Sequence, residues 1–377
     1  MDMIPMEEAI RIVQDRTARL EQTQVGLAES IGLYLSSDVL SDVDMPPFDK
    51  SMMDGYAVID ADVQAAADSS PATLEVIEEI PAGHVPELAV SQGKASRIMT
   101  GAPMPDGANA VVMVEDTSEE NGTVQVMDSV EAGENVAPLG QYIRRDEVVL
   151  ASGSQIRPPE IGILAAVGCT DVPVYRKPVV GVTATGSEIK EPDVQLAPGQ
   201  IRNSNGYSMA SQAERAGAES RYLGIVSDDM GDLERVLGEG LDGCDILLLS
   251  GGVSAGVYDL VQDTMRACGV EVHFDRIRMK PGKPLTFGSK GKQLIFGLPG
   301  NPLSAVVGLE LLVRPAIRKM MGARVLHRET VSGVLTEPFR QTPGRKQYVP
   351  AASKKVNGRW ETRSVGHQGS ADLFSMA

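Results

Sequence analysis

The segment Asp245-Ile246-Leu247-Leu248-Leu249-Ser250-Gly251-Gly252-Val253-Ser254-Ala255-Gly256 carries the clearest structural signal in this chain. Its apolar run shows no alternation, which is typical of a strand buried on both faces of a parallel sheet. Glycines and serines follow directly, and in such a loop backbone N–H groups can approach an anion closely. The spacing matches neither a P-loop nor the dinucleotide-binding fingerprint. We therefore expect an anion-binding strand end, with an ordinary strand-to-helix turn as the alternative.

The same alternation of strand and helix extends to both sides of this segment. Apolar runs predict strands near 178–185, 220–225, 270–274 and 293–296. Helical patterns lie near 205–216, 230–241, 258–267 and 302–320. Strands without alternation between helices predict a doubly wound α/β domain with a parallel sheet covered on both faces.

The remaining sequence has other patterns and predicts further domains. Residues 46–137 contain short β-rich runs between turns, which indicate a small β domain. After residue 322 only strands are predicted, and residues 325–377 hold eight Lys or Arg against four Asp or Glu, so this basic end is expected to be a small β-barrel or sheet. The predicted domains are 178–324 (α/β), 46–137, 325–377, and a discontinuous mixed α/β domain of 1–45 with 138–177.

Composition excludes several classes of protein. The chain has 377 residues and a net charge of −16, which argues against general nucleic-acid binding and against docking on an anionic membrane. Three separated cysteines form neither a disulfide framework nor a zinc motif. Neither a secretory signal nor a membrane-spanning run is visible. We expect a cytoplasmic protein whose anionic ligand, if it has one, binds in a local basic pocket.

Further motifs fall at the carboxyl ends of predicted strands, where doubly wound sheets bind ligands. Met279-Lys280-Pro281-Gly282-Lys283-Pro284 restrains two lysines, as an oxyanion clamp would, although a charged surface turn is the alternative. Gly297-Leu298-Pro299-Gly300-Asn301-Pro302 is either a ligand loop or a plain turn. Glu188 and Asp259 add carboxylates, and carboxylates beside anion-binding loops suggest Mg²⁺.

Six motifs together resemble one family, the molybdopterin molybdenumtransferases, which comprise the MoeA proteins and the corresponding domain of gephyrin. The resemblance covers nearly the whole chain. The motifs are Pro47-Phe48-Asp49-Lys50-Ser51-Met52-Met53-Asp54-Gly55-Tyr56-Ala57, Thr100-Gly101-Ala102-Pro103 with Gly107 and Ala110-Val111-Val112, Thr185-Gly186-Ser187-Glu188, Ser250-Gly251-Gly252-Val253-Ser254, Lys280-Pro281-Gly282-Lys283-Pro284 and Gly297-Leu298-Pro299-Gly300-Asn301-Pro302.

This resemblance implies an elongated, four-domain homodimer whose α/β domain is related to the molybdopterin adenylyltransferases and binds molybdopterin. The implied reaction inserts molybdate into the dithiolene of molybdopterin-AMP, releases AMP and forms molybdenum cofactor, with Mg²⁺. The domain of residues 46–137, with the loops of Asp54 and Thr100, would contribute to the partner's active site, and residues 1–45 with 138–177 would link and dimerise. A molybdopterin adenylyltransferase is a further partner that the resemblance suggests.

The resemblance also assigns residues, position by position. The catalytic positions are Asp54, Thr100, Glu188 and Asp259, and the candidate metal ligands are Glu188, Asp259 and Asp54. The substrate-binding positions are Gly251, Gly252, Ser254, Lys280, Lys283, Pro299, Pro302, Asp228, Arg144 and Ser370. Asp228 precedes a predicted helix, so it is equally an N-cap candidate.

Two departures from the family pattern leave alternatives open. After Arg144 the usual Gly-x-Asp turn is deleted, with Asp146 as a substitute acid, and Ser187 stands where Asp is common. A non-catalytic paralogue that binds molybdopterin as a carrier or scaffold would bind molybdopterin-AMP without turnover. A molybdopterin adenylyltransferase would instead turn over ATP with molybdopterin. The leading hypothesis remains the molybdate-inserting enzyme, which would release AMP. The chain also stops at Ala377, about a strand short of the family pattern, so the last domain is expected to be incomplete.

Overall fold

A computed structural model describes residues 2–251, 258–340, 343–366 and 369–376, with the backbone alone at Tyr258 and Asp259. The chain divides into two compact units. Unit 1 comprises 1–37, 152–161 and 171–377, and unit 2 comprises 38–151 and 162–170. The α/β and C-terminal segments thus fall in unit 1, and the β-rich segment falls in unit 2.

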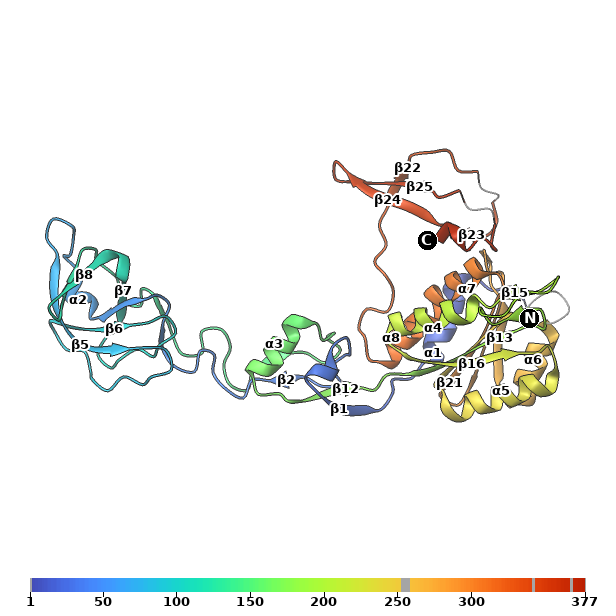
Figure 1. Cartoon of the computed structure of the whole chain (residues 1–377), viewed down its shortest axis with the longest axis horizontal. Coiled ribbons are helices and arrows are strands. Elements are labelled where there is room, and N and C mark those ends of the chain that lie inside the picture. The colour runs from blue at the N-terminus through green and yellow to red at the C-terminus, as the bar shows by residue number, and fades with distance from the viewer. Residues whose placement is uncertain (1, 252–257, 341–342, 367–368, 377) are drawn as a thin grey trace. The chain divides into compact units, whose positions relative to one another are not determined.

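A six-stranded sheet forms the centre of unit 1 (Figure 1). Its order is β16 (Glu219–Val226), β13 (Val179–Thr185), β17 (Ile246–Gly251), β21 (Gln293–Leu298), β20 (Pro284–Lys290) and β18 (Glu271–Arg276). The first four strands are parallel, but β20 is antiparallel to both β21 and β18. The prediction of a parallel sheet was therefore wrong at this side. The physical reason is the short 290–293 connection, because only antiparallel strands can be joined by a tight hairpin.

Helices cover both faces of this sheet (Figure 1). One layer contains α1 (Met6–Arg16), α4 (Asn205–Ala216), α7 (Pro302–Gly308), the π-helical turn Leu309–Val313 and α8 (Arg314–Met320). The other contains α5 (Met230–Gly243) and α6 (Tyr258–Ala267). Between α5, α6 and the sheet, Leu233, Val236, Leu237, Met265 and Ile295 belong to one buried cluster. The helices predicted from periodicity are confirmed, and 302–320 is helical throughout with a π turn in its middle.

Short elements complete unit 1. Antiparallel β1 (Gln22–Gly26) and β12 (Asp171–Tyr175) pair near the chain's entry to the sheet. In the C-terminal part a three-stranded sheet has the order β22 (Gly333–Leu335), β25 (Arg359–Ser364) and β24 (Ala351–Val356). The remaining elements are the 3₁₀ turns Ala28–Ser30 and Phe374–Met376, α3 (Pro158–Ala166), which crosses the boundary between the units, and the strands β14 (Ile189–Lys190), β15 (Ile201–Arg202), β19 (Met279–Lys280) and β23 (Lys346–Gln347).

Unit 2 is built on its own six-stranded sheet. The strand order is β7 (Ala110–Met113), β4 (Gly55–Val58), β6 (Lys94–Ile98), β5 (Ala72–Ile80), β9 (Thr123–Val126) and β8 (Thr117–Glu120). The buried cluster on this sheet includes Tyr56, Leu74 and Val124. The β-rich runs predicted within 46–137 thus lie in one sheet. Its short elements are β2 (Val39–Leu40), β3 (Lys50–Ser51), α2 (Asp60–Val63), the 3₁₀ turn Val114–Asp116, β10 (Val136–Ala137) and β11 (Val148–Leu150).

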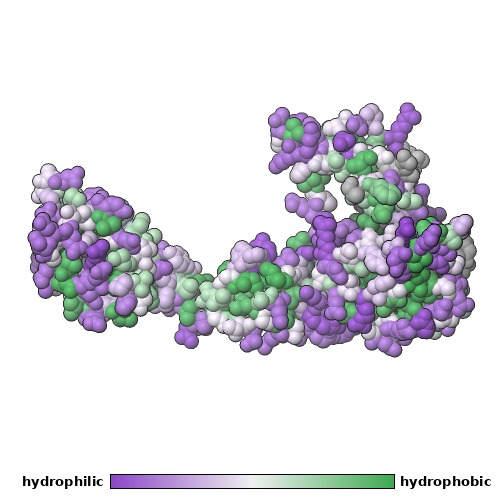
Figure 2. Space-filling view, in the orientation of Figure 1, coloured by the Kyte–Doolittle hydropathy of each residue, from purple (hydrophilic) through white to green (hydrophobic). Residues whose placement is uncertain are grey.

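Hydrophilic residues predominate on the face of the molecule that Figure 2 draws. Figure 2 shows polar side chains over most of the visible face, with apolar ones in smaller patches. None of the described helices is both long and apolar enough to cross a lipid bilayer.

Candidate functional site

Three of the predicted loops leave neighbouring strands at one edge of the sheet in unit 1. Thr185, the last residue of β13, is in register with Gly251 of β17, and Ser250 is in register with Leu298 of β21. The loops that begin with these residues are therefore adjacent, although up to 113 positions separate them along the chain. The adjacency follows from parallel pairing, which brings the carboxyl ends of strands together.

Hydrogen bonds hold this edge together. The Asn205 side-chain amide donates to the Ser250 hydroxyl at 2.7 Å and to the Gly300 carbonyl at 2.8 Å. Gly251 has φ +108°, and a Cβ there would collide with the carbonyl oxygen of Thr185. A Cβ at Gly300 would lie 3.4 Å from the Gly251 Cα. These glycines are needed because two backbone segments approach each other where a side chain would separate them.

Beside this edge lies a cavity of about 570 Å³, which we call the anion pocket. It brings together four of the predicted substrate-binding residues: Lys280, Lys283, Pro299 and Ser370. Pro302, the first residue of α7, is not among its lining residues. The other lining residues are Pro281, Gly282, Pro284, Asn301, Leu303, Ser304, Phe339, Arg340, Arg345, Gln347, Tyr348, Val349 and Gly369.

All charged side chains described in the lining of the anion pocket are positive. Lys280, Lys283, Arg340 and Arg345 line it, and none of the described lining residues is acidic. Four cations that converge in a chain of net charge −16 are typical of a site for an oxyanion or a phosphate. Sequence reasoning missed Arg340 and Arg345, for which the only signal was the net positive charge of 325–377.

The C-terminal part of unit 1 forms one wall of the anion pocket through backbone pairing. Strand β23 pairs in parallel with β19, and the Tyr348 N–H donates to the Lys280 carbonyl at 2.8 Å. On the other side, the Asn301 amide donates to the Ser370 hydroxyl at 3.0 Å. The Leu303 N–H donates to the Ser370 carbonyl at 3.1 Å. These bonds bring Ser370 against the start of α7.

Two predicted carboxylates lie near each other at the sheet edge. Glu188 and Asp228 are both exposed. Although Asp228 is exposed, incomplete solvation of its carboxyl and the neighbouring Glu188 charge raise its pKa, against a hydrogen bond from the Ser187 backbone that lowers it. The N-cap of α5 is Asp229, whose carboxylate accepts from the N–H groups of Gly231 and Asp232. The alternative capping role proposed for Asp228 therefore belongs to its neighbour.

Several predicted residues lie outside the described residues. Gly252 and Ser254 fall in the undescribed stretch 252–257. Asp259 lies in the first turn of α6, and its side chain is not described. Among the side chains that the structure does describe, no three His, Cys, Asp or Glu residues gather as metal ligands would.

The remaining predicted residues lie in unit 2. Asp54 accepts hydrogen bonds of 2.7 Å from both the Thr100 N–H and the Thr100 hydroxyl. These bonds lower the pKa of the Asp54 carboxyl, because they stabilise its charged form. The two motifs thus bring their catalytic candidates into direct contact.

Arg144 lies in a tight, exposed turn of unit 2. Its N–H donates to the Glu147 carboxylate at 3.0 Å, and Asp146 has φ +66°. The Asp146 N–H donates to the Ser41 carbonyl at 2.8 Å. The turn is therefore held by one hydrogen bond within it and by another to Ser41.

Comparisons with family models, curated sequences and solved structures all match this chain to the same family of proteins. Family models match residues 4–168 ("MoeA N-terminal region (domain I and II)"), 181–319 ("Probable molybdopterin binding domain") and 332–377 ("MoeA C-terminal region (domain IV)"). The molybdopterin molybdenumtransferase of Bacillus subtilis (strain 168) is 36% identical over 378 residues, which cover 99% of this chain and 88% of that protein. That of Nostoc sp. (strain PCC 7120) is 35% identical, with coverage of 100% and 88%. A crystal structure of the molybdopterin biosynthesis MoeA protein from Pyrococcus horikoshii OT3 is 31% identical with a TM-score of 0.84 and covers 100% of this chain and 93% of that one.

Proposed function

The chain belongs to the family of molybdopterin molybdenumtransferases, the MoeA proteins, and from that premise we propose where it binds its substrates. It is an enzyme of molybdenum cofactor biosynthesis. The relatives' names favour this activity over the carrier and adenylyltransferase alternatives. The substrates are molybdate and adenylylated molybdopterin, and the products are molybdenum cofactor and AMP.

The anion pocket is the proposed binding site for the oxyanions of the reaction. The observation that carries this assignment is the convergence of Lys280, Lys283, Arg340 and Arg345 without an acidic residue among the described lining. Molybdate is a compact dianion, and lysine ammonium and arginine guanidinium groups supply charge-assisted hydrogen bonds to such an ion. The glycine-rich sequence that follows β17 is the proposed site for the pterin phosphate, although its residues 252–257 lie outside the described residues. Release of AMP would be favoured by the same cations, because they neutralise charge on the departing phosphate.

We propose Glu188 and Asp228 as ligands of Mg²⁺, since the donor set fits that ion. Two carboxylates near enough to repel each other beside a phosphate site provide the hard oxygen ligands that Mg²⁺ prefers. When bound, the ion would neutralise phosphate charge. Asp259 remains a predicted third ligand. Asp54 and Thr100 are proposed to reach the site from the partner subunit of a homodimer, as the family resemblance implies.

The proposed site is tested by AMP release from molybdopterin-AMP in the presence of molybdate and Mg²⁺. Lys283→Ala removes one cation of the pocket and should raise the KM for molybdate about tenfold or more. Lys355→Ala, which removes an exposed lysine from β24, is the matched control and should leave both kcat and KM unchanged. Equal KM values for the two variants would remove Lys283 from the site.

Metal binding is tested separately with Mn²⁺ as a paramagnetic substitute for Mg²⁺. Water-proton relaxation measures Mn²⁺ binding to the purified protein without substrates. Asp228→Asn should weaken that binding, whereas Asp229→Asn keeps the helix cap and should not change it. Identical Mn²⁺ affinities for the two variants would contradict the proposed ligand.

A further inference from the structure

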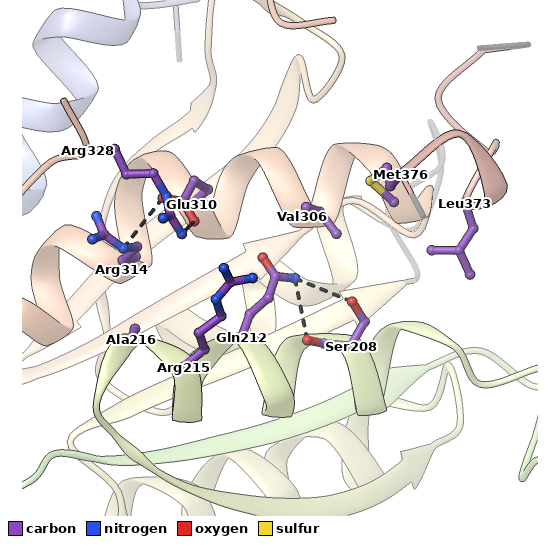
Figure 3. A pocket seen from close by; sticks show the side chains of 10 residues that line it. All are labelled: Ser208, Gln212, Arg215, Ala216, Val306, Glu310, Arg314, Arg328, Leu373 and Met376. Atoms are coloured by element: carbon purple, nitrogen blue, oxygen red, sulfur yellow. Dashed lines mark hydrogen bonds and ion pairs between the residues drawn. The ribbon is translucent and has the colours of Figure 1, made fainter. Parts of the chain in front are cut away.

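A second cavity in unit 1, of about 380 Å³, shares no lining residue with the anion pocket. It lies between α4 and the helical stretch 302–320, and residues near the C-terminal end close one side (Figure 3). Its lining residues include Arg215 and Ala216 of α4 and Val306, Glu310 and Arg314 of the helical stretch. Its size is within the range of small-molecule sites.

The polar end of this cavity carries more positive than negative charge. Arg215, Arg314 and Arg328 face a single described carboxylate, Glu310. The Arg328 Nε and Nη2 atoms lie 2.6 Å and 3.3 Å from the Glu310 oxygens. Arg314 Nε lies 3.5 Å from the same carboxylate. The Glu310 carboxylate is therefore shared between the guanidinium groups of Arg314 and Arg328, and Arg215 makes no ion pair with it.

Arg215 is the one of these three arginines that has no ion-pair partner among the described residues. Figure 3 shows its side chain extending from α4 toward the helix that carries Glu310 and Arg314. Within the described residues it makes no hydrogen bond or ion pair. Its five N–H donors are thus available to a ligand in the cavity.

The positive charge of Arg314 is only partly balanced by the Glu310 carboxylate. Its side chain is 13% exposed, and one guanidinium N–H group donates to the Leu326 carbonyl at 3.0 Å. Burial lowers its pKa despite Glu310, and the charges of Arg318 and Arg328 lower it further. A partly buried cation that shares its only nearby carboxylate with a second guanidinium gains from an additional anion.

We infer that this cavity binds a small organic anion with a carboxylate or phosphate head on an apolar body. The head would bind to Arg215 and Arg314, because guanidinium groups match planar and tetrahedral oxyanions through paired hydrogen bonds. The body would pack against Ala216, Val306 and Met376, which form the apolar wall together with Leu373. Neither the family models nor the relatives' names assign a ligand to these residues.

The test uses the methyl group of Met376 as a local reporter in the full-length protein. Methyl-¹³C methionine labelling gives one NMR signal for each methionine, and Met376→Leu identifies the signal at the cavity. Phenyl phosphate and benzoate are the two probes, and phenol is the neutral control. We expect both anions, or one of them, to shift the Met376 signal in a saturable way at millimolar concentration, while phenol does not. The stronger probe tells whether the head is a phosphate or a carboxylate.

Two variants link the response to the arginines. Arg215→Gln should weaken the binding of the anionic probe about tenfold, whereas Arg235→Gln on the opposite helix layer should not change it. Lys283→Ala should also leave the Met376 response unchanged, which separates this site from the anion pocket. AMP release by Arg215→Gln should equal that of the unmodified protein.

Three outcomes would overturn the inference. The first is a Met376 signal that neither anion moves. The second is a response of equal size to phenol, which would mean apolar binding alone. The third is a change of oligomeric state in Arg215→Gln or Ala216→Trp, measured by light scattering, which would mean that a second copy of the chain covers the cavity.

Discussion

At the residue scale, the absence of a side chain at Gly251 allows β17 and β13 to approach each other at the proposed site. Its positive φ and the nearby Thr185 carbonyl leave no room for a Cβ. We expect Gly251→Ala to reduce the free energy of unfolding of unit 1 by about 2 kcal/mol or more, measured by urea denaturation.

The control for this substitution is Gly199→Ala. Gly199 also has a positive φ, +83°, but a Cβ there would meet nothing within 4 Å. It should therefore show the backbone strain alone, which costs about 1 kcal/mol. Equal losses at the two positions would mean that the contact with Thr185 contributes nothing.

A second residue-scale prediction concerns the Asp54 carboxyl. The Thr100 hydrogen bonds lower its pKa, so its contribution to stability is present above the pKa of the unfolded chain and is lost as the pH falls through the lower folded value. Thr100→Val keeps the backbone N–H but removes the hydroxyl. Carbonyl-¹³C NMR titration should then show an Asp54 pKa closer to the ordinary value of about 4. Thr117→Val, in the same unit, should leave the Asp54 titration unaltered.

At the scale of elements, two adjacent aspartates at the start of α5 have different roles. Asp229 caps the helix, whereas Asp228 is the proposed metal ligand. Asp229→Ala should lower the free energy of unfolding by about 1 kcal/mol, and Asp229→Ser should restore most of it because serine is also a good N-cap. Thermal denaturation of the two variants measures the difference. If Asp229→Ala melted like the unmodified protein, the cap would have no energetic role.

Strand direction is the feature of the sheet that the sequence patterns failed to predict. The apolar runs of β13, β17 and β21 are recognisable because both faces are buried. Strand β20 was not predicted, and β18 was placed without its direction. An apolar run indicates burial but carries no information on direction, which depends on the length of the connection to the next strand.

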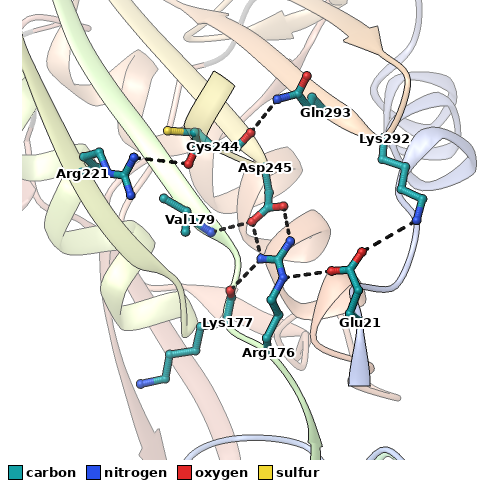
Figure 4. A network of polar contacts seen from close by, with 10 residues as sticks. Glu21, Arg176, Lys177, Val179, Arg221, Cys244, Asp245, Lys292 and Gln293 are labelled. Atoms are coloured by element: carbon teal, nitrogen blue, oxygen red, sulfur yellow. Dashed lines mark hydrogen bonds and ion pairs between the residues drawn. The ribbon is translucent and has the colours of Figure 1, made fainter. Parts of the chain in front are cut away.

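At the scale of the whole molecule, one polar network joins distant segments of unit 1 (Figure 4). Arg176 donates to both Asp245 carboxylate oxygens at 2.7 Å and to Glu21 at 2.9 Å. Asp245 also accepts from the Val179 N–H at 2.8 Å. The bidentate pair raises the pKa of Arg176. The network as a whole ties together the residue before β1, the linker after β12 and the residue before β17.

Removal of this arginine should be more costly than removal of an ordinary surface charge. Arg176→Ala leaves Asp245 partly buried without its partner, and we expect a loss of about 2 kcal/mol in unfolding free energy. Arg235→Ala, which breaks an exposed pair on α5, should cost about 0.5 kcal/mol or less. Chemical denaturation of both variants checks the difference, and equal small losses would show that water replaces the network.

The proposed sharing of the active site between subunits has its own test. Asp54→Asn should be severely impaired, and Lys283→Ala should be severely impaired when molybdate is kept well below its raised KM. If one subunit supplies Asp54 and its partner supplies Lys283, random exchange between the two variants leaves half of the dimers mixed, each with one intact site. AMP release should then recover to about a quarter of the normal rate. No recovery after confirmed subunit exchange would place both residues in the same chain's site.

The sequence by itself determined the order of elements, the loops at the strand ends and the family. Each of these signals is local, since hydrophobic periodicity and a glycine-rich turn act within a few residues. Only the tertiary structure placed Arg340 and Arg345 beside Lys280 and Lys283, because that convergence depends on β23 pairing with β19 across 65 residues of chain. It alone also distinguished Asp229 as the cap from Asp228 beside Glu188. Charged side chains have no periodicity that reveals their neighbours, so backbone pairing between remote segments decides which charges meet.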